Sequence, residues 1–182
     1  MKKRLFLFVL VAVIAAGALS AWEPNDLVKF PSGIEDGTWI INFGAGLYIP
    51  GSLINAYIPA IHLSVDRSTG LGEQKLPFFF GGLFGYSGEG YTPLWFVHKI
   101  TIGGRFGYHF NWGVDKLDTY AVTTAGVIIH TGNFGNRYNG GNWVLFGVNV
   151  GARYFFTDWF GLWAEAGYTS FSLFDIGVAF KF

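Results

Sequence analysis

The chain has 182 residues, and a single domain fits this length. Hydrophobic residues make up 51% of it and aromatic residues 20%, while charged residues make up only 13%, a composition that is unusual for a soluble domain. The formal net charge is zero, which gives no indication of a nucleic-acid partner. The sequence contains no cysteine, which excludes disulfide bonds, thiolate metal sites and a lipid-modified cysteine.

The first 21 residues have the pattern of a secretory signal peptide. Three basic residues precede an apolar run from Leu5 to Leu19, and the small residues Ser20 and Ala21 follow it. At about 1.5 Å per residue this run reaches roughly 22 Å, less than the hydrocarbon core of about 30 Å, which disfavours an uncleaved anchor helix. We expect residues 1–21 to direct Sec-type export and residues 22–182 to form the mature domain.

After residue 21 the chain alternates between large apolar residues and small or polar ones, a period of two that is typical of β-strands with unlike faces. In the first such segment, TWIINFGAGLY, Trp39, Ile41 and Phe43 oppose Asn42 and Gly44. Five later segments follow the same rule, whereas the facing of PFFFGGLFGY and TYAVTTAGVIIH is ambiguous. We expect eight strands, over residues 38–48, 54–66, 77–87, 95–111, 118–130, 143–156, 159–169 and 172–182.

The two faces of these strands predict a transmembrane barrel. One face is uniformly apolar and aromatic, and the other carries glycine with sparse charges, which suits an outer surface in lipid and a polar lumen. Every backbone N–H and C=O group in hydrocarbon needs a partner, so such strands must close into a barrel. Tyr and Trp residues gather near the strand ends, as in the interfacial girdles of membrane barrels. A soluble periplasmic barrel with the opposite facing is the alternative.

The chain ends in SLFDIGVAFKF, in which Phe174, Ile176, Val178, Phe180 and Phe182 alternate with small or charged residues. This segment resembles the C-terminal strand of bacterial outer-membrane β-barrel proteins, which typically ends in Phe. The resemblance implies that Phe174, Phe180 and Phe182 belong to a signal read by the β-barrel assembly machinery. It also implies an all-β fold in the bacterial outer membrane, a transmembrane antiparallel up-and-down barrel of eight strands similar to outer-membrane proteins A, X and W.

An eight-stranded barrel has an interior just wide enough for side chains to fill it, so broad porin-like diffusion is not expected. The predicted lumenal face carries charges of both signs, and buried charges need partners. We therefore expect an ion-pair network in the lumen, formed by Lys99, Arg105, Arg153, Glu165 and Asp175. The alternative is a narrow wet path along the lumenal glycines.

Three motifs are weak indications of chemistry. IHLSVD places His62, Ser64 and Asp66 on one strand face, but successive residues on that face lie about 6.5 to 7 Å apart, too far for a direct proton relay. GGLFGYSGEG has the spacing G-x-x-G-x-x-G, yet no helix pattern follows it, so no dinucleotide site is expected. HTGNFGNRYNGGN has the composition of an exposed loop that can contact a surface ligand.

These observations favour a non-enzymatic outer-membrane barrel with a structural or surface-interaction role. A narrow channel for small or hydrophobic solutes is the first alternative, and a lipid-modifying enzyme of the outer membrane is the second. The expected partners are outer-membrane lipids, the assembly machinery and an unidentified surface ligand. No catalytic residue, cofactor or metal site is predicted.

Overall fold

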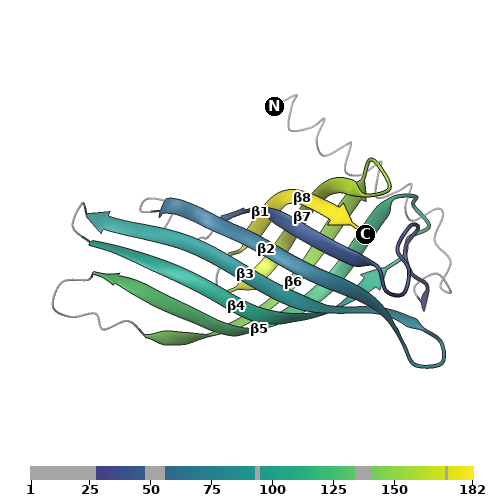
Figure 1. The fold of residues 1–182 in the computed structure, drawn as a ribbon, viewed down its shortest axis with the longest axis horizontal. Helices are drawn as coiled ribbons and strands as arrows, with labels where there is room; N and C mark the ends of the chain where they lie inside the picture. The colour runs from purple at the N-terminus through teal and green to yellow at the C-terminus, as the bar shows by residue number, and fades with distance from the viewer. Residues whose placement is uncertain (1–27, 48–55, 93–94, 134–140, 171) are drawn as a thin grey trace, which may run out of the picture.

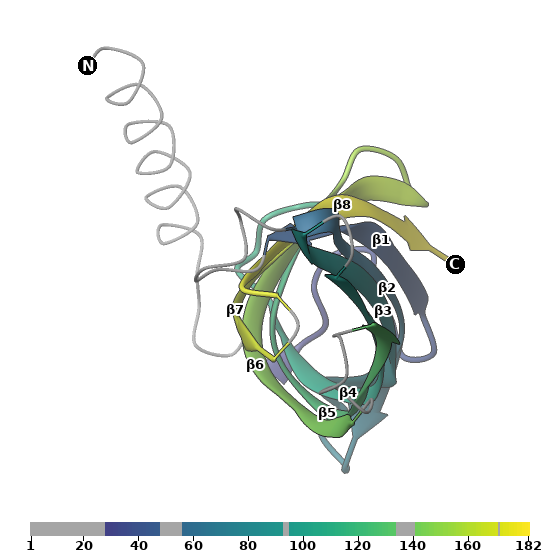
Figure 2. The ribbon, with the colours of Figure 1, turned by 90° about the vertical axis from the view of Figure 1, so that its left-hand side faces the viewer.

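The computed structural model describes residues 28–47, 56–92, 95–133, 141–170 and 172–182. These residues form a closed barrel in which each strand is antiparallel to the next and the last strand pairs with the first (Figures 1 and 2). Among the described residues there is no helix of sufficient length and hydrophobicity to span a membrane. The strands are β1 Trp39–Leu47, β2 Ala56–Leu71, β3 Leu76–Thr92, β4 Trp95–Phe110, β5 Leu117–Asn133, β6 Asn142–Phe155, β7 Phe160–Thr169 and β8 Phe174–Lys181. The predicted eight-stranded up-and-down barrel is confirmed.

Two predicted strand ends are wrong, because β2 and β3 continue past residues 66 and 87. Pairing runs on from Arg67 with Phe80 to Leu71 with Leu76, so the true turn between β2 and β3 is Gly72–Lys75. Gly72 adopts a φ of 73° there, in the left-handed region that suits glycine. The Ser-Thr-Gly run before it has turn composition, but its backbone is held in the sheet by β3.

The strands differ in length around the barrel. β2 to β5 have 16 or 17 residues, whereas β1, β7 and β8 have 8 to 10. The long strands therefore extend the wall on one side, beyond the ends of the short strands (Figure 1). We call the opposite end, where the β2–β3, β4–β5 and β6–β7 connections lie, the turn end.

Side-chain facing follows the predicted alternation. Along β6, residues alternate between exposed and buried, with Val144 79% exposed and Val150 62% exposed while Arg153 is fully buried. On β4, Ile102 and Phe106 point outward. The apolar face is thus the outer surface and the charged face lines the lumen, which is the opposite of a soluble barrel.

Glycine on the inner face makes room for large lumenal side chains. A Cβ atom at Gly151 would collide with the Tyr120 ring, and one at Gly107 would collide with the Phe79 ring. These rings fill the lumen near the turn end, so the small residues of one strand allow the aromatic residues of its neighbours to pack.

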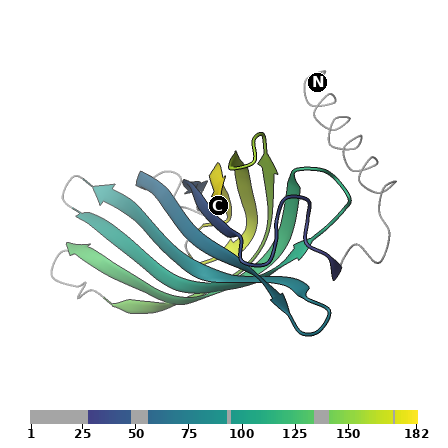
Figure 3. The same cartoon turned by 45° about the vertical axis from the view of Figure 1, so that its right-hand side comes forward.

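Residues 28–38, which precede β1, fold into the turn end of the barrel (Figure 3). Ile34 joins the buried lumenal cluster that includes Phe79 and Tyr120, and Phe30 packs against that cluster. At the same end, Trp39 and Phe182 exchange two backbone hydrogen bonds of 3.0 and 2.9 Å. We call residues 28–38 the N-terminal segment; it packs against the lumenal cluster at the turn end.

Candidate functional site in the charged lumen

The centre of the lumen holds two buried guanidinium groups bridged by one carboxylate. Arg105 projects from β4 and Arg153 from β6, and both reach Asp66 of β2. Arg105 Nε lies 3.0 Å from Asp66 Oδ1, and Arg153 Nη2 lies 2.7 Å from Asp66 Oδ2. One aspartate therefore joins three strands of the barrel through charge-assisted hydrogen bonds.

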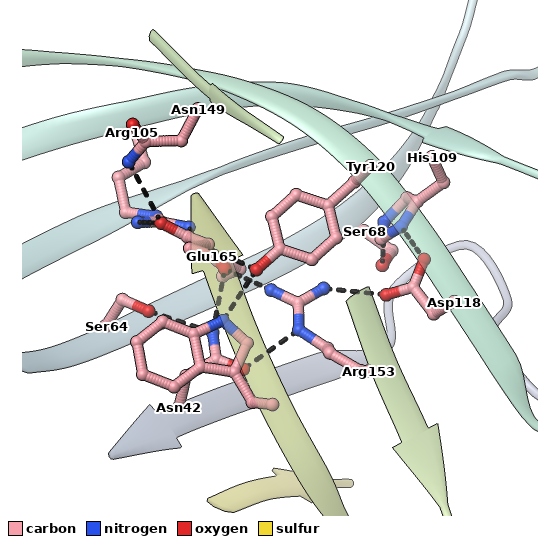
Figure 4. Close-up of polar contacts among 12 residues, drawn as sticks. Asn42, Ser64, Ser68, Arg105, His109, Asp118, Tyr120, Asn149, Arg153 and Glu165 are labelled. Carbon is pink, nitrogen blue, oxygen red and sulfur yellow. Dashed lines mark hydrogen bonds and ion pairs between the residues drawn. The ribbon is translucent and has the colours of Figure 1, made fainter. Parts of the chain in front are cut away.

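Glu165 of β7 completes the pairing of Arg105 (Figure 4). Both terminal nitrogens of Arg105 donate to the Glu165 carboxylate, one of them to Oε2 at 3.3 Å. Tyr120 donates its hydroxyl proton to Glu165 Oε1 at 2.7 Å, and Asn149 Nδ2 donates to Oε2 at 3.3 Å. Glu165 is only 1% exposed, so these donors compensate the cost of burying its charge.

Arg153 has a second carboxylate partner nearer the turn end. Its Nη1 donates to Asp118 Oδ2 at 2.7 Å, and its Nε donates to Asn42 Oδ1 at 2.9 Å. The guanidinium carbon also lies 4.1 Å from the centre of the Tyr120 ring, within the range of a cation–π contact. Every nitrogen of Arg153 is therefore engaged.

We call Asp66, Arg105, Asp118, Arg153 and Glu165 the charged layer. Two guanidinium groups face three carboxylates in it, and the ion-paired side chains are at most 1% exposed. Ions that are buried this completely keep their charge only while their partners remain in place. The layer therefore crosses the middle of the barrel and links β2, β4, β5, β6 and β7.

A histidine and a serine extend the charged layer toward the turn end. His109 Nδ1 lies 2.7 Å from Asp118 Oδ1, and its Nε2 lies 3.1 Å from Ser68 Oγ (Figure 4). All three side chains are buried. This is the geometry of a serine–histidine–aspartate relay, formed by three residues that lie outside the IHLSVD motif.

On the other side of the charged layer several buried polar atoms have no hydrogen-bond partner. They belong to His62, Thr101, Asn149 and Asp175. His62 Nδ1 lies 3.5 Å from Asp175 Oδ1, and the other oxygen of Asp175 accepts a hydrogen bond of 2.6 Å from Ser172 Oγ. Buried polar atoms of this kind are typically satisfied by internal water.

Three of the five residues predicted for the lumenal network, Arg105, Arg153 and Glu165, lie in the charged layer. The ion pairs of the two arginines run to Asp66, Asp118 and Glu165. Asp175 contacts His62 and Ser172 instead. Lys99 lies half-buried on the inner face of β4, outside those ion pairs.

The sequence pattern did not identify Asp118, Tyr120 or Ser68 as members of the lumenal network. Asp118 and Tyr120 begin a strand whose facing was ambiguous in the sequence, although their alternation with Val122 and Thr124 marks the inner face. Ser68 was missed because the predicted strand stopped at residue 66. A longer second strand would have placed Ser68 on the same face as Asp66.

The IHLSVD motif forms no relay, as expected from its spacing. Ser64 accepts a hydrogen bond from Asn42 Nδ2 at 2.8 Å, and Asp66 is committed to the two arginines. GGLFGYSGEG lies within β3 and pairs with β4. Most of the predicted HTGNFGNRYNGGN loop, residues 134–140, falls outside the described residues.

Within the described ranges, no group of three or more His, Asp or Glu side chains is placed to hold a metal ion. Comparison with protein-family models gave no match, and comparison with curated proteins gave no significant match.

Proposed function

We propose that this protein is an integral outer-membrane β-barrel with a structural role, whose lumen is sealed by the charged layer. The observation that carries the proposal is the facing of the strands, with charges inside and apolar side chains outside. In water this arrangement would expose a large apolar surface on every side. In a bilayer it places that surface against acyl chains and satisfies all backbone groups within the closed sheet.

The height of the apolar surface supports a membrane location. On the outer face of β6, each residue from Val144 to Tyr154 at every second position is apolar or aromatic. At about 3.3 Å per residue and a tilt of about 40°, these ten residue steps cover roughly 25 Å, the height of the apolar band on outer-membrane barrels. Trp39 and Trp159 are about half-exposed on the outer face at the turn end, where an interfacial girdle would lie.

Delivery to the membrane is part of the proposal. Phe174 is exposed on the outer face of β8, Phe180 is partly exposed on the same strand, and Phe182 is exposed directly after it. We infer that these three residues are read by the assembly machinery before β8 pairs with β1, and that residues 1–21 direct export. Outer-membrane lipids are then the main partner of the finished barrel.

A narrow conduit is the second candidate, and the unpartnered atoms of His62, Thr101, Asn149 and Asp175 are the observation that favours it. Water at these atoms would wet the lumen on one side of the charged layer. The charged layer and the N-terminal segment lie between that region and the turn end. Conduction would therefore require the ion pairs to rearrange, which makes the sealed barrel the better supported function.

The test is fractionation of cells that express the full-length chain. We expect the protein in the outer-membrane fraction, extractable only with detergent, and migrating faster on gels before heating than after it. Recovery as a soluble periplasmic protein without detergent would overturn the proposal. The purified protein should give no steady conductance in planar bilayers, whereas a stable current in the unmodified protein would favour the conduit.

A further inference from the structure

The contacts of Asp118 determine which atoms of the Ser68–His109–Asp118 relay donate hydrogen bonds and which accept them. Asp118 is paired with Arg153 through Oδ2, so it is ionised and can only accept hydrogen bonds. His109 Nδ1 therefore donates to Asp118 Oδ1 at 2.7 Å. In the neutral imidazole Nε2 is then an acceptor, and it lies 3.1 Å from Ser68 Oγ. The serine hydroxyl thus faces a base that is itself oriented by a carboxylate, as in activated serine nucleophiles.

The region beside Ser68 is filled by the chain's own N-terminal segment. Phe30 and Ile34 pack against the lumenal cluster that includes Phe79 and Phe155. The Phe30 ring centre lies 6.2 Å from that of His109. The segment therefore packs against apolar side chains next to the relay. Ser68 is 1% exposed.

Two polar side chains hold carbonyl groups of the same segment. Asn111 Nδ2 donates to the Phe30 carbonyl oxygen at 3.0 Å, and Lys181 Nζ donates to the Gly33 carbonyl oxygen at 2.7 Å. Without the segment, this amide and this ammonium group would each lose the carbonyl that they hold. Donors of this type can bind the carbonyl oxygen of an ester.

We propose that the turn end of the barrel is a latent acyl-transfer site, with Ser68 as nucleophile and His109 as general base, and that the N-terminal segment occupies it in place of a substrate. Asp118 acts as a positioning residue. The matching substrate class is an ester with an apolar acyl group, because Phe30 supplies an apolar side chain and a carbonyl at the same place. The proposal is independent of the membrane location argued above.

The chemistry needs no additional reactant beyond water. Ser68 Oγ forms a bond to the acyl carbonyl carbon while its proton passes to His109 Nε2. The bond between that carbon and the leaving oxygen breaks, and the leaving alcohol takes the proton from His109. Water then attacks the acyl-serine with its proton accepted by His109, and the Ser68 hydroxyl is restored as the carboxylic acid leaves.

The experiment measures covalent labelling of detergent-purified full-length barrel by a fluorescent fluorophosphonate, with the adduct located by mass spectrometry. Two variants are designed to release the N-terminal segment: Phe30→Ala with Ile34→Ala removes its apolar anchors, and Ile34→Asp puts a charge into the buried apolar cluster that Ile34 joins. Faster cleavage after Glu35 by an endoproteinase specific for glutamate reports release. Unchanged heat-modifiable migration reports that the barrel is still folded.

We expect at least tenfold faster labelling of Ser68 in both released variants than in the unmodified protein. In the released background, Ser68→Ala should abolish the adduct, and His109→Asn should slow labelling by about 100-fold because the general base is lost. Asp118→Asn should slow it less while leaving the same serine labelled. Ser87→Ala, at a lumenal serine on β3 outside the relay, is the matched control and should leave the rate unchanged.

Folded variants that are cleaved after Glu35 but not labelled at Ser68 would overturn the proposal. Labelling that persists after Ser68→Ala, or that is unaffected by His109→Asn, would also overturn it. Hydrolysis of para-nitrophenyl butyrate by the released variants, dependent on Ser68, would extend the result from acylation to turnover.

Discussion

Replacing Glu165 with alanine tests whether the charged layer seals the barrel. The substitution removes the acceptor of four hydrogen bonds, two from Arg105, one from the Tyr120 hydroxyl and one from Asn149. Breaking a buried ion pair by removing one partner costs about 3–5 kcal/mol in soluble proteins. Arg105 keeps its 3.0 Å contact with Asp66, so we expect a loss of about 3 kcal/mol, at the lower end of that range.

A double-mutant cycle separates the ion pair from the other contacts of Glu165. Arg105→Met removes the charge and retains an apolar side chain of similar length. Combined with Glu165→Ala, it should be less destabilising than the sum of the single substitutions, with a coupling energy of about 2–3 kcal/mol. The free energy of unfolding is measured by urea titration of protein refolded in lipid vesicles, followed by tryptophan fluorescence.

The same variants distinguish a seal from a conduit. If the charged layer excludes water, Glu165→Ala lowers the free energy of unfolding without producing a current in planar bilayers. If the lumen is already wet, the loss of stability is small and the variant shows a new or altered ion current. The ion-pair argument would be refuted if Glu165→Ala changed neither the free energy of unfolding nor the current, and if its effect on stability simply added to that of Arg105→Met. This result would mean that Glu165 does not support the charged layer.

Three further predictions concern assembly, packing and lipid contact. Deleting Phe182 should lower the amount of barrel in the outer membrane while leaving the unfolding midpoint of the refolded protein nearly unchanged; equal outer-membrane levels would contradict the assembly role. Gly151→Ala should destabilise by about 1–3 kcal/mol because its Cβ meets the Tyr120 ring, whereas Gly104→Ala, with nothing within 4 Å, should be nearly neutral in the same urea titration. Val148→Lys on the outer face should cost about 2–4 kcal/mol in vesicles, and a neutral effect would argue against lipid contact there.

Much of the barrel is determined by local pattern. Alternation with a period of two specifies a strand and assigns each residue to one of two faces, because successive side chains point to opposite sides. This is why the lumenal facing of Arg105, Arg153 and Glu165 could be predicted from the sequence, and why the number of strands was correct. The same pattern does not determine the strand limits, since Ser68, Thr69 and Gly70 have turn composition but lie in the sheet.

What the sequence by itself determined, then, is the eight-stranded barrel, its apolar exterior and the set of charges that enters the lumen. The pairing of those charges was decided only by the tertiary structure. Arg153 meets Asp66 across 87 positions of sequence, and Ser68 meets His109 across 41. Such contacts depend on the stagger between neighbouring strands and on barrel closure, which set the height of each side chain in the lumen. The placement of Phe30 and Ile34 inside the turn end has the same origin, because only a closed barrel offers the apolar space that they fill.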